Sequence, residues 1–139
     1  MGQDLHIVAE RMLSSGRYVA IEHVQPFVAL RDYTVHGLLG GRGDELPELA
    51  ILRERHGIPP NASAATREYF ESDKRSLGVF CSPARWLTMR ELDSIDWSSD
   101  EHGGPTGLTY RQALPRFFFR DLRHLKRYGA DRVVYWFTE

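Results

Sequence analysis

The sequence has only one cysteine, no surplus of one charge and no long apolar run. Cys81 has no partner in the chain, so no internal disulfide can form. The 18 basic and 19 acidic residues give a net charge of −1, which argues against a dedicated nucleic-acid-binding protein, because such proteins carry a basic excess. No apolar stretch approaches the roughly 20 residues of a membrane-spanning helix. We therefore expect a cytoplasmic protein with no membrane segment and no signal peptide.

The length and composition fit one globular unit. The chain has 139 residues, of which 42% are hydrophobic and 27% are charged, and these proportions are typical of a folded domain with its own core. No internal repeat, low-complexity segment or linker divides the sequence. We therefore predict a single domain over residues 1–139.

Four segments have the β-branched and aromatic character of strands. They cover residues 4–11, 17–24, 77–82 and 132–138. The turn signal Ser-Ser-Gly separates the first two, which are expected to form a hairpin.

Helices are predicted from capping residues and glycine stops, over residues 31–41, 44–57, 64–74, 89–97 and 109–128. Asp32 and Ser63 are expected N-caps, and Thr88 with Glu91 has the spacing of a capping box. In the last helix, Pro115 marks either a kink or the true start. The order of elements predicts an α+β fold: a small, mainly antiparallel sheet with helices packed on one side, built from the N-terminal hairpin, a middle strand and a C-terminal strand.

Asp4 and His6 occupy alternate positions of the first predicted strand. Their side chains, and that of Glu10, therefore point away from the core face, which carries Leu5 and Ile7. A carboxylate beside an imidazole fits an acid–base or metal-ligand pair. The same pattern also fits the exposed polar side of an edge hairpin, since antiparallel sheets normally have one polar face. The sequence leaves both interpretations open.

The other candidate residues follow the third predicted strand. Ser82, Arg85 and Trp86 combine a hydroxyl, a guanidinium and an aromatic ring, which suits stacking and polar recognition. Cys81 has apolar neighbours and is interpreted as a small buried hydrophobic residue. None of the six histidines has a zinc-site spacing, so no metal and no cofactor is predicted.

A basic stripe follows the last predicted helix. Its members recur at spacings of three and four: Arg116, Arg120, Arg123 and Arg127. Such a stripe can bind phosphates, but with a neutral overall charge we interpret it as a solvated helix face.

Several stretches together resemble a family of small uncharacterised phage and bacterial proteins that begin MGCDIH. The matching pieces occur in the same order: MGQDLH, RDYTVHGLLGG, GIPPNASAATR, CSPARWLTMREL and VVYWF. The resemblance implies a phage or prophage context and a shared pocket, but no established activity. The family's polar positions fall on Asp4, His6, Arg31, Tyr33, Ser82, Trp86 and Thr88.

Two departures from the family pattern weaken a metal-dependent enzyme. The family's cysteine at position 3 is Gln3 here, and the histidine that opens its serine-rich stretch is Cys81. Arg85 is an insertion relative to the pattern.

Two functions are compatible with these residues. The first is a phage-type protein that binds and sequesters a small anionic, nucleotide-derived molecule such as a defence signal, because Arg and His suit an anion while Trp and Tyr suit a flat ring. The alternative is a small hydrolase or lyase acting on a phosphate ester or nucleotide, with His6 and Asp4 as an acid–base pair. A homo-oligomer is left open. The predicted ligand-binding residues are Asp4, His6, Arg31, Tyr33, Ser82, Arg85 and Trp86.

Overall fold

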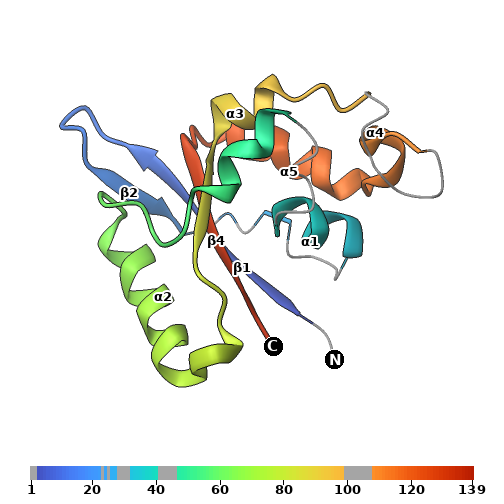
Figure 1. Ribbon diagram of the computed structural model, residues 1–139. Helices are drawn as coiled ribbons and strands as arrows, with labels where there is room; N and C mark the ends of the chain where they lie inside the picture. The colour runs from blue at the N-terminus through green and yellow to red at the C-terminus, as the bar shows by residue number, and fades with distance from the viewer. Residues whose placement is uncertain (1–2, 23, 25, 28–31, 41–46, 99–107) are drawn as a thin grey trace.

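The computed structural model describes residues 3–22, 24, 26–27, 32–40, 47–98 and 108–139. Its centre is a four-stranded sheet in the order β2-β1-β4-β3. The strands are β1 (Asp4–Met12), β2 (Tyr18–Ile21), β3 (Arg85–Thr88) and β4 (Arg132–Thr138), and every neighbouring pair is antiparallel. The two central strands come from opposite ends of the chain, so both ends lie side by side at one edge of the molecule (Figure 1).

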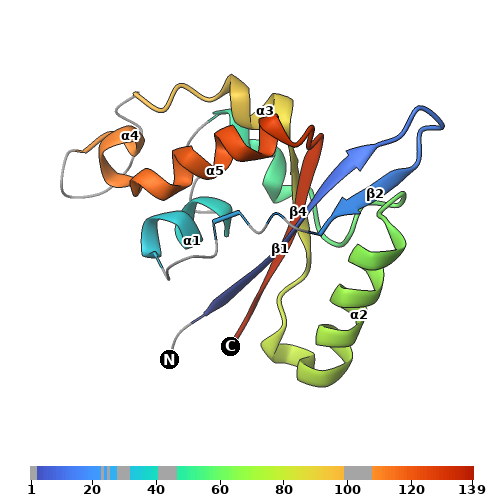
Figure 2. The same cartoon turned by 180° about the vertical axis from the view of Figure 1, so that it is seen from behind.

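Helices of the described residues cover both faces of the sheet, with a larger group on one face than on the other (Figures 1 and 2). The first group contains α1 (Tyr33–Leu39), α3 (Met89–Ser94), α4 (Tyr110–Ala113) and α5 (Arg116–Arg127), and the opposite face carries α2 (Ala64–Leu77). The described residues also form the 3-10 helices η2 (Pro47–Arg53) and η3 (Gly78–Phe80). The predicted α+β class with an antiparallel sheet is confirmed. Most of the helices pack on one side of the sheet, as predicted, and α2 covers the other side.

Local signals explain where the helices begin. The side chains of Asp32 and Ser63 cap α1 and α2 as predicted, because each accepts hydrogen bonds from free backbone N–H groups of the first turn. Thr88 and Glu91 form both halves of the predicted capping box at α3. The helix predicted over residues 109–128 is two helices, because Pro115 is extended and precedes the first residue of α5.

The prediction of a strand over residues 77–82 is wrong. Leu77 is the last residue of α2, and Gly78 follows it with a φ of 55°, a conformation that glycine adopts without steric cost. The apolar residues that follow form η3, and Cys81 makes only an isolated bridge to β4. The middle strand begins later, at Arg85, because the apolar run contains the last residue of α2 and the short helix η3.

Strand alternation divides the sheet into two unlike faces. The face toward α1, α3, α4 and α5, which we call the core face, carries the larger apolar cluster, and its strand residues include Leu5, Ile7, Ala9, Leu87, Val133, Tyr135 and Phe137. The opposite face, which we call the α2 face, carries a smaller cluster around Val134 and Trp136. No helix within the described residues is long and apolar enough to cross a membrane.

Candidate functional site

The structure separates the predicted binding residues. Asp4, His6 and Trp86 lie on the α2 face. Arg85 lies on the core face, because it pairs with Tyr135 whereas Trp86 pairs with Val134. The side chains of Arg85 and Trp86 therefore point to opposite sides of the sheet, although the two residues are neighbours in the sequence.

The remaining predicted residues have other places in the fold. Ser82 extends the contact between β3 and β4, since its hydroxyl accepts a hydrogen bond from the backbone N–H of Phe137 at 2.9 Å. Tyr33 is the first residue of α1, and Arg31 lies outside the described residues.

On the core face, burial raises the pKa of Tyr135 well above its ordinary value, and Arg85 acts in the opposite direction.

His6 lies in a polar and aromatic cluster between β1, β4 and α2. Its Nδ1 is 2.6 Å from the hydroxyl of Tyr69, and its Nε2 is 2.7 Å from the hydroxyl of Thr138. The imidazole stacks on Trp136, whose indole N–H donates to Asp73 at 2.9 Å. The Asp73 carboxylate is also 3.7 Å from Nδ1 of His6. Both imidazole nitrogens are therefore engaged, and the cluster holds α2 against the sheet.

The electrostatics of the His6 cluster favour hydrogen-bond donors over anions. Burial and the Asp73 carboxylate both raise the pKa of Tyr69 above its ordinary value, so this environment disfavours a negative charge on the phenol oxygen. Asp4 is exposed on the same sheet face, on the same strand as His6. An anionic ligand at this end of the sheet would meet two carboxylates.

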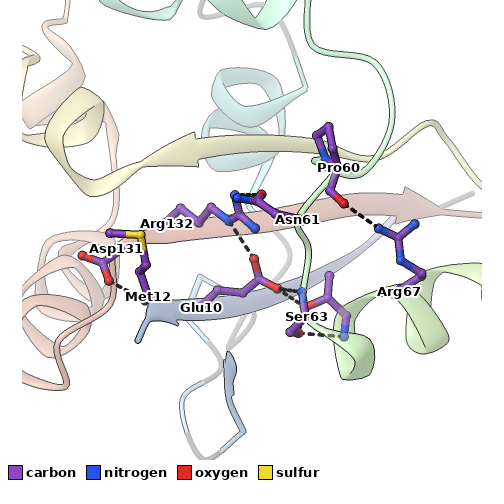
Figure 3. A network of polar contacts seen from close by, with 9 residues as sticks. Glu10, Met12, Pro60, Asn61, Ser63, Arg67, Asp131 and Arg132 are labelled. Atoms are coloured by element: carbon purple, nitrogen blue, oxygen red, sulfur yellow. Dashed lines mark hydrogen bonds and ion pairs between the residues drawn. The ribbon is translucent and has the colours of Figure 1, made fainter. Parts of the chain in front are cut away.

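Glu10, expected on an open polar face, is fully buried (0% exposed). Its carboxylate accepts hydrogen bonds from Nε of Arg132 at 2.7 Å, from the backbone N–H of Ser63 at 2.8 Å and from the hydroxyl of Thr66 at 2.7 Å (Figure 3). The expectation fails because β1 is a central strand and the first turn of α2 covers it. A carboxylate at a helix N-terminus is stabilised by the helix dipole, so Glu10 anchors α2 to the sheet.

Two guanidinium groups and two aromatic rings alternate across the α2 face. Cζ of Arg55 lies 3.7 Å from the centre of the Trp86 ring. Cζ of Arg132 lies 3.4 Å from the centre of the Tyr18 ring and 5.8 Å from that of Trp86. We call Arg55, Trp86, Arg132 and Tyr18 the arginine–aromatic row. Its members come from β3, β4, β2 and the segment after η2.

Arg55 already has partners for both of its terminal nitrogens. It forms a bidentate pair with Glu91, at 2.6 and 2.8 Å, and donates to the carbonyl of Trp86 at 3.0 Å. Burial alone would raise the pKa of Glu91, but hydrogen bonds from Arg55 and Thr88 outweigh it and hold the pKa below its ordinary value. This pair joins the segment after η2 to the start of α3.

Arg132 is not fully committed. Its Nε donates to Glu10 at 2.7 Å and its Nη1 donates to the side-chain oxygen of Asn61 at 2.9 Å. Its Nη2 is buried and has no hydrogen-bond partner among the described residues. Most buried polar atoms in proteins are hydrogen-bonded, so an acceptor placed beside this nitrogen would be stabilised. Within the described residues, Arg132 is therefore the member of the row that has a buried donor without a partner.

The sequence singles out Trp86 together with Arg85, because a guanidinium and an aromatic ring suit recognition. The guanidinium that lies over the Trp86 ring is that of Arg55. One signal for Arg132 was available: a charged residue opens an otherwise apolar strand. Arg55 had no local signal, because only the tertiary fold brings it to β3.

Three other sequence predictions concern residues outside the row. Cys81 is buried, at 1% exposed, and burial raises the pKa of its thiol, which fits a small hydrophobic residue. The four arginines of the basic stripe on α5 are all exposed. No group of three His, Cys, Asp or Glu residues within the described ranges is arranged to hold a metal ion.

Comparisons with protein-family models, with curated proteins and with solved structures found no match for this chain.

Proposed function

We propose that this protein binds a small, nucleotide-like molecule at the arginine–aromatic row. Such a molecule combines a flat ring with hydrogen-bond acceptors, and arginine recognises both by stacking and by donating. The observation that carries the proposal is Nη2 of Arg132, a buried donor without a partner among the described residues. The same guanidinium lies within 3.4 Å of the Tyr18 ring and 5.8 Å of the Trp86 ring.

The composition of the row favours holding a ligand over converting it. Both carboxylates beside the row, Glu10 and Glu91, already accept hydrogen bonds from its arginines. The nearest acid–base group on β1 is His6, which lies about 13 Å from Glu10 at roughly 3.3 Å per strand residue. Groups at the row can therefore orient a ligand, while its two carboxylates are already held by arginine.

The phage context implied by the sequence resemblance suggests a biological role for such binding. A protein that holds a nucleotide-derived signal without converting it lowers the free concentration of that signal in the host cytoplasm. The single, unpaired Cys81 supports a reducing compartment. Sequestration of a defence signal is therefore the form of binding that we propose.

The test is calorimetry and thermal melting with a panel of nucleosides, nucleotides and cyclic dinucleotides. A bound ligand must raise the melting temperature. Arg132→Lys keeps a cation beside Glu10 but removes Nη2 and the planar stacking surface, so we expect binding to weaken by about tenfold or more. Tyr18→Leu, on the edge strand β2, should weaken binding through lost stacking.

Arg127→Lys is the matched control, since Arg127 is exposed on α5 and its replacement should leave binding unchanged. The proposal is contradicted if no member of the panel raises the melting temperature. It is also contradicted if a ligand binds Arg132→Lys and Tyr18→Leu as tightly as the unmodified protein.

The His6 cluster supports a second candidate, a small hydrolase or lyase. In this candidate site the Asp73 carboxylate lies 3.7 Å from Nδ1 of His6. It would orient the imidazole as a general acid or base. A ligand recovered intact after heat denaturation of the protein indicates binding. A converted ligand, with conversion lost in His6→Gln, would instead establish the enzyme.

A further inference from the structure

Each cation of the arginine–aromatic row already has its own carboxylate. Arg55 pairs with Glu91 at 2.6 Å, and Arg132 pairs with Glu10 at 2.7 Å. The charges within each of the two pairs cancel. Glu10 is fully buried and is bonded to the same guanidinium whose Nη2 has no hydrogen-bond partner among the described residues. A phosphate monoester carries a charge of about −1.5 to −2 at neutral pH. It would find no uncompensated cation in the row and would be repelled by the buried carboxylate.

The free N–H donors of Arg132 instead suit a neutral hydrogen-bond acceptor. A guanidinium carries five N–H donors in one plane, and both N–H bonds of Nη2 in Arg132 are free among the described residues. An acceptor atom that takes these bonds lies in the guanidinium plane. Cζ of Arg132 lies over the Tyr18 ring, 3.4 Å from its centre, and 5.8 Å from the centre of the Trp86 ring. A flat ligand bonded to Nη2 would therefore lie close to both aromatic rings.

Asn61 shows what kind of acceptor Arg132 binds in addition to its own carboxylate. The Asn61 side chain is a neutral amide, and its oxygen accepts a hydrogen bond from Nη1 of Arg132 at 2.9 Å (Figure 3). Asn61 is exposed and lies in the turn closed by the Ala62 N–H to Pro59 carbonyl bond. An amide carbonyl on a ring, as in a nucleobase, presents the same acceptor chemistry together with a face that can stack.

From this charge balance we infer that the row recognises the nucleobase of its ligand and not the phosphate, so that the ligand class is a nucleoside or the base portion of a nucleotide. This inference rests on the proposed function and narrows it. It also revises the anionic character expected of the ligand, since the phosphates of a bound nucleotide would project away from Glu10 and toward solvent.

The test compares each nucleoside with its mono- and triphosphate by calorimetry, at about 50 mM and about 300 mM salt. We expect affinities for one base to agree within about threefold across the phosphate series and to change little with salt. Excess inorganic phosphate should not compete. Arg132→Lys and Tyr18→Leu should each weaken the nucleoside and its phosphates equally, by about tenfold for the former.

The outcomes separate this inference from the proposed function. If affinity rises about tenfold or more with each phosphate, or falls steeply with salt, phosphate is the recognised group. The inference is then overturned while the proposed function stands. If neither nucleosides nor nucleotides bind, both are overturned.

Discussion

At the scale of single residues, the ion pair between Glu10 and Arg132 links two central strands, a helix and the proposed site. Both side chains are at least nine-tenths buried, at 0% and 4% exposed. A buried pair of this kind contributes little compared with an apolar pair, but the loss of one partner leaves an uncompensated charge. The position therefore tolerates few substitutions, whatever its role in binding.

The first prediction concerns this pair. Glu10→Ala leaves the Arg132 guanidinium without its carboxylate and removes two acceptor contacts to α2, so the free energy of unfolding should fall by about 3–5 kcal/mol. Glu10→Gln keeps acceptor geometry and should lose less. Urea denaturation measures both. Glu68→Ala, exposed on α2, should stay within about 0.5 kcal/mol, and an equally small change for Glu10→Ala would show that the pair is unimportant.

The same scale shows why part of the site could not be predicted. Neighbouring strand residues point to opposite faces, so Arg85 and Trp86 can share a pocket only outside a strand. Because the strand is predicted over residues 77–82, Arg85 and Trp86 fall outside it, and the sequence does not reveal that their side chains point to opposite faces. Glu10 is buried because α2 covers it, and the position of α2 in the sequence does not indicate which strand this helix covers. Trp86 was identified because an aromatic residue beside polar residues is a local signal.

At the scale of secondary-structure elements, helix starts were predictable because capping is local. Ser63, Asp32 and Thr88 each act within one turn of their own position. The placement of α2 was not predictable in the same way. Among its residues only Thr66 is buried, so its sequence carries no strong apolar stripe to indicate a packing face.

The second prediction concerns the start of α3. The hydrogen bonds from Arg55 and Thr88 hold the pKa of Glu91 below its ordinary value, against the effect of burial. A lowered pKa contributes stability above the unfolded pKa, and that stability is lost as the pH falls through the folded pKa. Glu91→Gln should therefore destabilise the protein at pH 7, by about 1–2 kcal/mol, and the difference should shrink below about pH 4.

Denaturant titrations at several pH values measure this effect. Asp93→Asn is the control, because the pair of Asp93 with Lys126 is about half exposed (46% and 55%) and such surface pairs contribute little. An equal loss of stability for Glu91→Gln at pH 7 and at pH 3 would refute the role assigned to its ionised carboxylate.

The third prediction concerns α2 as a unit. Polar contacts hold this helix to the sheet at both ends, through Glu10 at its start and through Tyr69 and Asp73 further along. Elements with few buried apolar contacts open locally at lower free energy than the core. Amide hydrogen exchange should therefore be faster in α2 than in β1 and β4, and Glu10→Gln should accelerate exchange in α2 selectively. Exchange in α2 as slow as in β4 would contradict this.

At the scale of the whole molecule, the two faces of the sheet have different tasks. The core face buries the larger apolar cluster, and composition alone predicted a core of this kind in an α+β domain. The α2 face gathers the polar network, the His6 cluster and the arginine–aromatic row, all of which depend on contacts between distant segments. The fold class was therefore accessible from sequence, whereas the arrangement on the α2 face was not.

The chain's three tryptophans provide separate probes of these regions. Trp86 belongs to the row, Trp136 stacks on His6, and Trp97 is buried in the core-face cluster. Each indole N–H gives its own signal in a proton–nitrogen NMR spectrum, so a single titration reports on all three regions at once.

A titration of this kind with the four common nucleosides tests whether the arginine–aromatic row binds a nucleobase. We expect at least one nucleoside to shift the Trp86 indole signal saturably while the Trp97 and Trp136 signals stay unchanged. No shift with any nucleoside, or a shift confined to Trp136, would contradict it, since a ligand would then be absent or bound beside His6.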